Sequence, residues 1–274
     1  MTILQSIIMG IIQGLSEFLP ISSTAHLLIG QQLMGIKPGA DIFAFLIIVQ
    51  LGTILSLLVF FGRDLWQIIK SVILNLSSLF KFKTLPLEAR LGWYILLATI
   101  PALLVGFLLR HLVKQLFNSP LLEASIRLLA AALVMTLAEW LGKRTRQVES
   151  MTWLDALFIG VMQVIAVFPG ASRSGTTISA GLLRNFDRPS AARFAFLLSI
   201  PVLLAAGGYE MLSLLKTPGL SSFMSILLAG LLSAALVGWL AVRWFMGYLS
   251  KHSLKWFIVY CLVVGLVCLV FFLV

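Results

Sequence analysis

The chain alternates between long apolar runs and short polar breaks. Six runs are long enough for helices that cross a bilayer, which need about 20 mainly apolar residues. We expect these crossings at residues 43–61, 91–110, 123–141, 193–213, 223–246 and 256–274. The pattern predicts an all-α polytopic membrane protein.

Two further apolar stretches, residues 1–35 and 153–184, carry Ser, Thr, Gln, Pro and a charged residue in the middle. A helix that faces lipid does not tolerate these residues at membrane depth. We therefore expect two re-entrant hairpins. Each would consist of a helix, a break and a second helix, entering and leaving on one side of the membrane.

Composition supports this class of protein. Hydrophobic residues make up 60% of the chain and charged residues 11%, whereas soluble domains have about 45–50% and about 25%. The net charge of +10 does not indicate a nucleic-acid partner, because most Lys and Arg residues lie at the ends of apolar runs. The positive-inside rule then places the loop after the first crossing in the cytoplasm. The C-terminus and the start of the first hairpin are expected outside.

Short sequence matches recur in the same order in the two halves of the chain. Gly10-Ile-Ile-Gln13 matches Gly160-Val-Met-Gln163, Phe43-Ala-Phe-Leu46 matches Phe194-Ala-Phe-Leu197, and Leu104-Val-Gly-Phe-Leu108 matches Leu236-Val-Gly-Trp-Leu240. These matches predict one membrane domain, residues 1–274, with repeat one at about 1–115, repeat two at about 153–250, and 123–141 and 256–274 as additional helices. Three crossings separate the hairpins, so the repeats are inverted and their polar segments are expected to meet near the midplane.

The first polar segment, Gln13 to His26, places an acid, four hydroxyls and an imidazole inside an apolar hairpin. Pro20 interrupts the helix, and Ser22, Ser23 and Thr24 suit the start of the next one. A helix cap alone would explain the hydroxyls, a buried ion pair would explain Glu17, and core packing would explain His26. Their combination favours a catalytic site, since Ser23 and His26 are three residues apart and share a helix face.

The second polar segment, Phe168 to Thr177, resembles a phosphate-binding loop in its chemistry. Pro169 and Gly170 predict a turn, several hydroxyls follow, and Gly175 allows close approach of the backbone to a ligand. The helix that starts here offers free amide groups to an anion, and Arg173 supplies a planar donor fork suited to phosphate oxygens. The alternative is a surface turn with a snorkelling arginine.

Together the motifs Gln13-x-x-x-Glu17, Phe-Leu-Pro-x-Ser-Ser-Thr-x-His26 and Pro169-Gly-x-Ser-Arg-Ser-Gly-x-Thr177 resemble those of the undecaprenyl-diphosphate phosphatase family, also known for bacitracin resistance. The resemblance spans both halves of the chain. It implies a multi-pass enzyme of the bacterial plasma (inner) membrane. This enzyme would remove the terminal phosphate of undecaprenyl diphosphate and recycle the lipid carrier for peptidoglycan synthesis.

The resemblance also implies roles for individual residues. The catalytic set is Ser23, His26, Glu17 and Arg173, and the substrate-binding set is Gln13, Ser22, Thr24, Ser172, Ser174, Gly175 and Thr177. A divalent cation, Mg or Ca, is implied with Glu17 as its protein ligand. Because residue 13 is Gln rather than Glu, a metal site with two carboxylates is not expected. The nucleophile is either Ser23 or a water, with His26 as base or leaving-group acid and Glu17 orienting His26 or the metal.

The expected partners are a polyprenyl diphosphate and membrane lipids, with a homodimer left open and no nucleic acid. We expect the active site to open to the outer, periplasmic face. A polyprenyl-phosphate flippase or phosphate-lipid transporter is the competing function, because inverted repeats with broken helices are a transporter architecture. The group of Ser23, His26 and Glu17 favours the phosphatase, since transport alone does not need it.

Overall fold

The structure, a computed structural model, describes residues 1–37, 39–77, 82, 84–115, 119–166, 172–214 and 223–273. Within these ranges the named elements are α-helices and one 3-10 helix, which confirms the predicted all-α class. The helices are α1 (Ile3–Phe18), α2 (Ser23–Leu33), α3 (Ala40–Phe60), α4 (Gly62–Leu74), α5 (Leu87–Gln115), α6 (Pro120–Leu141), α7 (Trp153–Ile165), α8 (Arg173–Leu183), α9 (Arg188–Leu214), α10 (Met224–Leu249) and α11 (Lys255–Leu273), with η2 at Val148–Ser150.

Each of the six predicted crossings coincides with a helix: α3, α5, α6, α9, α10 and α11. Within the part of the chain that the structure describes, the last five are each long and apolar enough to span a membrane. The sixth span requires α3 to be counted with α4, from which it is bent by 76°. The protein is therefore an integral, multi-pass membrane protein.

Helix α4 is absent from the sequence prediction, which ends the first crossing at residue 61 and continues with a loop. The structure bends the chain at Phe61 and starts a 13-residue helix there. Trp66 on this helix is 68% exposed. Val72, on the other face, packs closely against Gly92 of α5, where an added Cβ would lie 2.4 Å from the Val72 side chain. A short helix with one packed face and one exposed apolar face suits the membrane interface, and its length is insufficient for a crossing.

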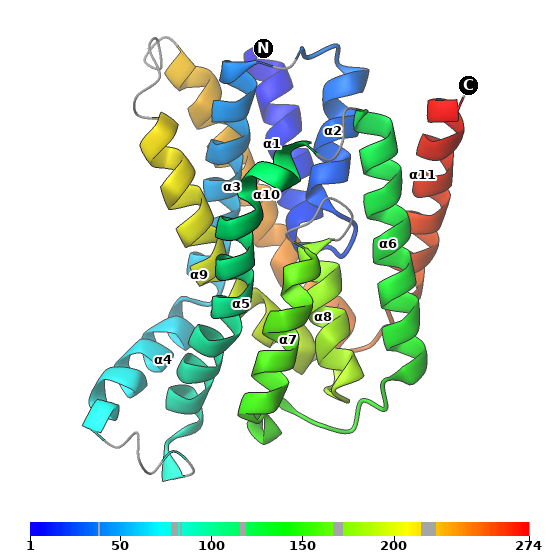
Figure 1. The fold of residues 1–274 in the computed structure, drawn as a ribbon. Coiled ribbons are helices and arrows are strands. Elements are labelled where there is room, and N and C mark those ends of the chain that lie inside the picture. The colour runs from blue at the N-terminus through cyan, green and yellow to red at the C-terminus, as the bar shows by residue number, and fades with distance from the viewer. Residues whose placement is uncertain are drawn as a thin grey trace.

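Two helix pairs form hairpins that reach the middle of the molecule from opposite ends (Figure 1). The pair α1–α2 starts at the end that also holds the C-terminus, and the pair α7–α8 starts at the other end. Neither α1 nor α7 is long enough to cross a membrane, at 16 and 13 residues. The tips of the hairpins, where polar residues interrupt the apolar pattern, therefore meet inside the helix bundle.

Equivalent glycines bring each hairpin into close contact with a long helix. A Cβ on Gly10 of α1 would lie 2.5 Å from the backbone oxygen of Gly230 on α10, and a Cβ on Gly160 of α7 would lie 2.4 Å from that of Ala98 on α5. The sequence matches align Gly10 with Gly160 and place Ala98 opposite Gly230. These contacts support the inverted repeat, whose exact extent stays a prediction.

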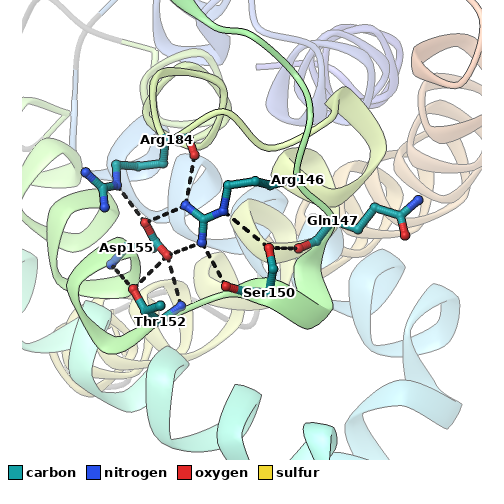
Figure 2. Close-up of polar contacts among 6 residues, drawn as sticks. All are labelled: Arg146, Gln147, Ser150, Thr152, Asp155 and Arg184. Carbon is teal, nitrogen blue, oxygen red and sulfur yellow. Dashed lines mark hydrogen bonds and ion pairs between the residues drawn. The ribbon is translucent and has the colours of Figure 1, made fainter.

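A buried carboxylate fixes the mouth of the second hairpin (Figure 2). Asp155, fully buried in the first turn of α7, forms ion pairs with Arg146 at 2.7 Å and with Arg184 at 2.6 Å. It also completes a capping box with Thr152, as its position near the helix start predicts. Burial disfavours the charged carboxylate, but hydrogen bonds from Arg146, Thr152 and Arg184 outweigh this effect and lower the pKa of Asp155.

Candidate active site

Glu17 is the centre of the polar contacts at the tip of the first hairpin. It lies in the last turn of α1 and is 8% exposed. Its Oε2 accepts hydrogen bonds from Ser23 Oγ at 2.5 Å and from Gln13 Nε2 at 3.0 Å. Its Oε1 pairs with the guanidinium of Arg173 from the second hairpin. One carboxylate thus contacts three of the side chains that the two sequence motifs singled out.

The backbone between α1 and α2 holds a hydroxyl-bearing residue in an unfavourable conformation. Leu19 is extended and Pro20 follows it, so α1 ends there. Ser22 then adopts φ 66° and ψ 94°, a region that residues with a side chain rarely occupy. Such strain persists only where surrounding contacts hold it, and it is common at functional sites. It directs the chain so that α2 starts at Ser23, beside Glu17.

The second hairpin starts its inner helix with a capped turn. Ser172 is the N-cap of α8, and its Oγ accepts a hydrogen bond from the Gly175 N–H at 3.2 Å. Arg173 is the first residue of α8, and its side chain is 18% exposed. The predicted turn at Pro169 and Gly170 lies outside the described residues.

Direct contacts join the two tips, which are more than 150 residues apart in the sequence. Besides the ion pair between Arg173 and Glu17, Ser174 Oγ donates a hydrogen bond to the Leu19 carbonyl at 3.0 Å. A Cβ on Gly175 would lie 3.6 Å from Pro20 Cβ, which is ordinary contact. The sequence prediction that both polar segments form one joint site agrees with these contacts.

A polar cavity of about 180 Å³ lies at this junction. Its lining residues come from both hairpins and from α3, α6 and α9: Glu17, Ser22, Ser23, Thr24, Gln50, Arg127, Ala166, Ser172, Arg173, Ser174 and Leu203. Hydroxyls, two guanidinium groups and one carboxylate dominate the wall. A cavity of this chemistry in an apolar bundle suits a polar headgroup.

Two helices begin at the cavity wall. Ser23 and Thr24 open α2, Arg173 and Ser174 open α8, and all four residues line the cavity. The free amide groups and dipole of a helix N-terminus favour an anion, so the two ends act together. With the guanidinium groups they make the cavity suited to a phosphate group.

The remaining predicted substrate-binding residues are adjacent to the cavity without lining it. Gln13 contacts Glu17 through its amide nitrogen. Thr177 donates from Oγ1 to the Arg173 carbonyl at 2.8 Å, inside its own helix. Gly175 lies against the Ser172 side chain, where a Cβ would come within 3.2 Å of Ser172 Cβ. These residues contact Glu17, Arg173 and Ser172, the groups that line the cavity.

His26 points to a different neighbour from the one that the sequence suggests. Its Nδ1 is 2.9 Å from the Ser22 carbonyl, and its Nε2 is 2.7 Å from the hydroxyl of Tyr260 on α11. The two rings stack with their centroids 5.6 Å apart. In the described contacts the imidazole therefore bonds to Ser22 and Tyr260, whereas Ser23 bonds to Glu17.

Sequence reasoning missed two polar residues of the cavity wall, besides the apolar Ala166 and Leu203. Gln50 lies inside the first crossing and Arg127 inside the third, and both line the cavity. A charged side chain in an apolar crossing is a functional candidate by default. That rule identifies Arg127 from the sequence alone, whereas only the packing of α3 shows that Gln50 faces the site.

An apolar groove of about 750 Å³ lies on the other side of the first hairpin. It is formed by α1, α10, α11 and the tip of the hairpin, with the lining residues Leu15, Leu19, Ile21, Leu240, Ala241, Trp244, Tyr248, Trp256, Phe257 and Tyr260. Tyr260 lines the groove and contacts His26. The groove and the polar cavity are thus neighbours, separated by the tip of the first hairpin.

Glu17 and Gln13 are the side chains near the cavity whose oxygens could hold a divalent cation. Within the described residues, no group of three or more His, Cys, Asp or Glu side chains is placed to hold a metal. The Oε1 of Gln13 is buried, however, and has no hydrogen-bond partner. Magnesium commonly binds through one or two carboxylates and the phosphates of a substrate. Glu17 and the free amide oxygen of Gln13 fit a cation held mainly by a diphosphate.

Comparison with known proteins agrees with this site. Residues 6–267 match the family described as bacitracin resistance protein BacA. An undecaprenyl-diphosphatase of Chlorobium luteolum is 42% identical over 278 residues, covering 97% of this chain and 95% of that protein. Undecaprenyl-diphosphatases of Syntrophobacter fumaroxidans and Corynebacterium glutamicum are 36% and 39% identical, covering 97% and 96% of this chain and 95% and 88% of those proteins. With a match over nearly its whole length, and with both motifs gathered at one cavity, the chain belongs to the bacitracin resistance protein BacA family.

Proposed function

We propose that the protein hydrolyses undecaprenyl diphosphate to undecaprenyl phosphate and inorganic phosphate. This reaction returns the lipid carrier to peptidoglycan synthesis and gives resistance to bacitracin. The observation that carries the proposal is the cavity in which Ser23 donates a hydrogen bond to Glu17 while Glu17 pairs with Arg173. The undecaprenyl-diphosphatase relatives support the same activity and do not favour a transporter.

Binding of the terminal phosphate depends on the second hairpin. Arg173 offers its guanidinium, Ser172 offers a hydroxyl, and the start of α8 offers backbone amides, while Ser174 holds the two tips together through its bond to Leu19. Phosphoryl transfer gains most of its acceleration from positioning and from charges that are in place before the reaction starts. These groups offset the negative charge of the phosphate oxygens, which otherwise repels the attacking oxygen.

Glu17 is placed to accept the proton of the attacking group. Its Oε2 already accepts a hydrogen bond from Ser23 Oγ at 2.5 Å. An arriving phosphate competes with Glu17 for Arg173, which frees the carboxylate to hold the Ser23 hydroxyl alone. Substrate binding therefore activates Ser23 when the phosphate is in position. This assigns to Glu17 the base role that the sequence alone suggested for His26.

Two forms of the attack fit the geometry. In the first, Ser23 Oγ bonds to the terminal phosphorus, the bond to the bridging oxygen breaks, and undecaprenyl phosphate leaves with that oxygen. Water then cleaves the phosphoserine and releases inorganic phosphate. In the second, a water held by Ser23 and Glu17 attacks directly, and the same bond breaks in one step.

The test is phosphate release by the purified protein in detergent, where transport has no meaning. We expect Ser23→Ala to reduce release by at least about 100-fold. An acid-quenched reaction with substrate labelled in the terminal phosphate separates the two forms of attack. Labelled Ser23 supports the first form, whereas labelled phosphate with no labelled protein supports the second. Normal release by Ser23→Ala would remove Ser23 from the mechanism.

The lipid tail is proposed to lie in the apolar groove. The groove has a volume of about 750 Å³, is lined mainly by Leu, Phe, Trp and Tyr, and is adjacent to the polar cavity. Burial of apolar area there supplies binding energy at about 25 cal/mol per Å², so a long polyprenyl chain gains more than a short one. The headgroup would then reach the cavity past the pair of His26 and Tyr260.

A divalent cation, Mg or Ca, is proposed to bind at Glu17 and the diphosphate, with the Gln13 amide oxygen as a further ligand. Such an ion neutralises phosphate charge. Gln13→Glu supplies a second carboxylate beside Glu17, so half-maximal activity should need several-fold less Mg²⁺. An unchanged Mg²⁺ requirement in this variant would place the cation elsewhere.

We also propose that the protein resides in the bacterial plasma membrane and that the cavity opens to the outer face. The first hairpin and α6 both contribute residues to the cavity, and both start at the end of the molecule that holds the two termini (Figure 1). Most basic loops of the sequence follow helices at the opposite end, which the positive-inside rule places in the cytoplasm.

Thiol labelling in intact cells tests the orientation. Thr24→Cys places a thiol on an exposed residue of the cavity wall, and the native Cys261 and Cys268 are buried. A membrane-impermeant maleimide should label it in spheroplasts. Glu149→Cys, on an exposed residue at the other end, should react only after permeabilisation. The opposite labelling pattern would invert the topology.

A further inference from the structure

Arg127 brings a second guanidinium to the cavity from a helix outside both hairpins. It lies about two turns after Pro120, the first residue of α6, and its side chain is 13% exposed. It lines the same cavity as Arg173. A cation at membrane depth is costly to bury, so its position in the wall requires an anionic partner.

The described contacts of Arg127 give it one such partner. Its Nε and one terminal nitrogen both donate to Glu123 Oε1, at 3.0 and 2.6 Å. This pair repeats the arrangement in which Arg173 is held by Glu17. Each guanidinium of the cavity is thus paired with a carboxylate, but of the two carboxylates only Glu17 lines the cavity. A phosphate there would meet Arg127 through the donors that face the cavity.

A diphosphate headgroup presents two phosphates to these two guanidinium groups. Arg173 is tied through Glu17 to Ser23, so a phosphate on Arg173 lies at the attacking hydroxyl. The other phosphate remains for Arg127. We propose that Arg127 binds the lipid-linked phosphate that the product retains, and that the pair of arginines selects diphosphates over monophosphates. This inference rests on the proposed phosphatase function.

The test compares two soluble inhibitors of phosphate release, pyrophosphate and inorganic phosphate, at fixed free Mg²⁺. If the proposal holds, pyrophosphate contacts both arginines, whereas inorganic phosphate fills one position. Removing Arg127 alone would leave Glu123 unpaired, which destabilises a protein for unrelated reasons. The informative comparison is therefore Glu123→Gln, which keeps the cation, against the double variant Glu123→Gln with Arg127→Met, which removes it.

We expect the double variant to bind pyrophosphate about 10-fold or more weakly than Glu123→Gln, the loss typical of a charge-assisted pair. Its KM for the polyprenyl diphosphate should rise in parallel. Inhibition by inorganic phosphate should stay within about twofold of the Glu123→Gln value, because that ion needs only the Arg173 position. Glu123→Gln itself should retain pyrophosphate inhibition.

Three results would overturn the inference. Pyrophosphate inhibition at the parent level in both variants means that Arg127 does not contact the second phosphate. The same loss of inhibition, relative to the parent, in both variants means that the ion pair only supports α6. A parallel loss of both inhibitors means that the cavity as a whole was disturbed.

If the double variant does not fold, Glu123→Gln with Arg127→Lys takes its place, because a lysine lacks the donor fork. Unchanged pyrophosphate inhibition there also contradicts the inference. The parent protein separates this result from the proposed function. A parent that releases no phosphate refutes the phosphatase, whereas an active parent with an unaffected double variant refutes only the role of Arg127.

Discussion

Glu17 accepts hydrogen bonds from Gln13 and Ser23 and pairs with Arg173. The sequence indicates its importance because a carboxylate in an apolar run is costly unless it has a function or a partner. The sequence does not indicate which partner takes which oxygen. The structure places Ser23 on Glu17 and His26 on Tyr260, which separates two residues that are only three positions apart.

This separation predicts different losses for two single variants. Glu17→Gln keeps a side chain of the same shape but cannot accept the Ser23 proton, so kcat should fall by about 100-fold or more. His26→Gln, which disturbs the contact with Tyr260, should lower kcat by less than about 10-fold and mainly raise KM. Steady-state phosphate release measures both. A larger kcat loss in His26→Gln would restore the histidine as the base.

At the scale of elements, the second hairpin is held at both ends. Its tip contacts the first hairpin through Arg173 and Ser174, and its mouth is held by Asp155 between Arg146 and Arg184 (Figure 2). The two arginines come from the segments that precede α7 and follow α8. The buried carboxylate therefore closes the hairpin at the end away from the cavity and supports the position of Arg173.

Asp155→Asn should lower the stability of the protein in detergent by about 2 kcal/mol. Breaking a buried pair costs about 3–5 kcal/mol, and the partial exposure of both arginines, 27% and 38%, reduces this value. The folded-state pKa of Asp155 is lowered, so its contribution is fully present above the unfolded pKa of about 4 and is lost as pH falls below it. Thermal unfolding at several pH values measures the difference.

The expected difference between parent and variant is constant from pH 8 to about pH 5 and shrinks in more acidic buffer. Ser150→Ala in the same cluster is the matched control, because Arg146 bonds the Ser150 side chain only at 3.3 Å and keeps its bond to the Ser150 carbonyl. A difference that grows on acidification would contradict the role given to Asp155.

At the scale of the whole molecule, the bundle separates a polar cavity from an apolar groove by the thickness of one hairpin tip. Glu17 and Ser22 face the cavity, while Leu19 and Ile21 between them line the groove. A lipid with a charged headgroup requires this pairing of environments, since each part of the molecule is costly to bury in the other.

The groove predicts a dependence of activity on chain length. Leu240→Trp narrows the groove, so KM should rise several-fold for undecaprenyl diphosphate and change little for a short polyprenyl diphosphate. Leu232→Trp is the control, because Leu232 is also exposed on α10 but does not line the groove. Kinetics with both substrates measure the effect. Equal changes with both chain lengths would argue against the groove as the tail site.

Much of the fold follows from the hydrophobic pattern. The six crossings and both hairpins are predicted, because apolar length and polar interruption are local properties of the sequence. The sequence prediction misses helix α4 and places a loop there. A 13-residue interfacial helix is too short, and apolar on only one face, to give the signal of a crossing. The joint site is predicted from the repeat, but the turn at Pro169 and Gly170 stays a prediction.

The sequence by itself determined the class of the protein, its crossings and the two motifs that carry its chemistry. These features depend on the cost of placing polar groups in a membrane, which each segment meets on its own. Only the tertiary structure decided that Glu17 holds Ser23, that His26 turns to Tyr260, and that Arg127 joins the cavity. Such contacts depend on how helices distant in sequence pack, because distances between side chains on different helices are set by that packing.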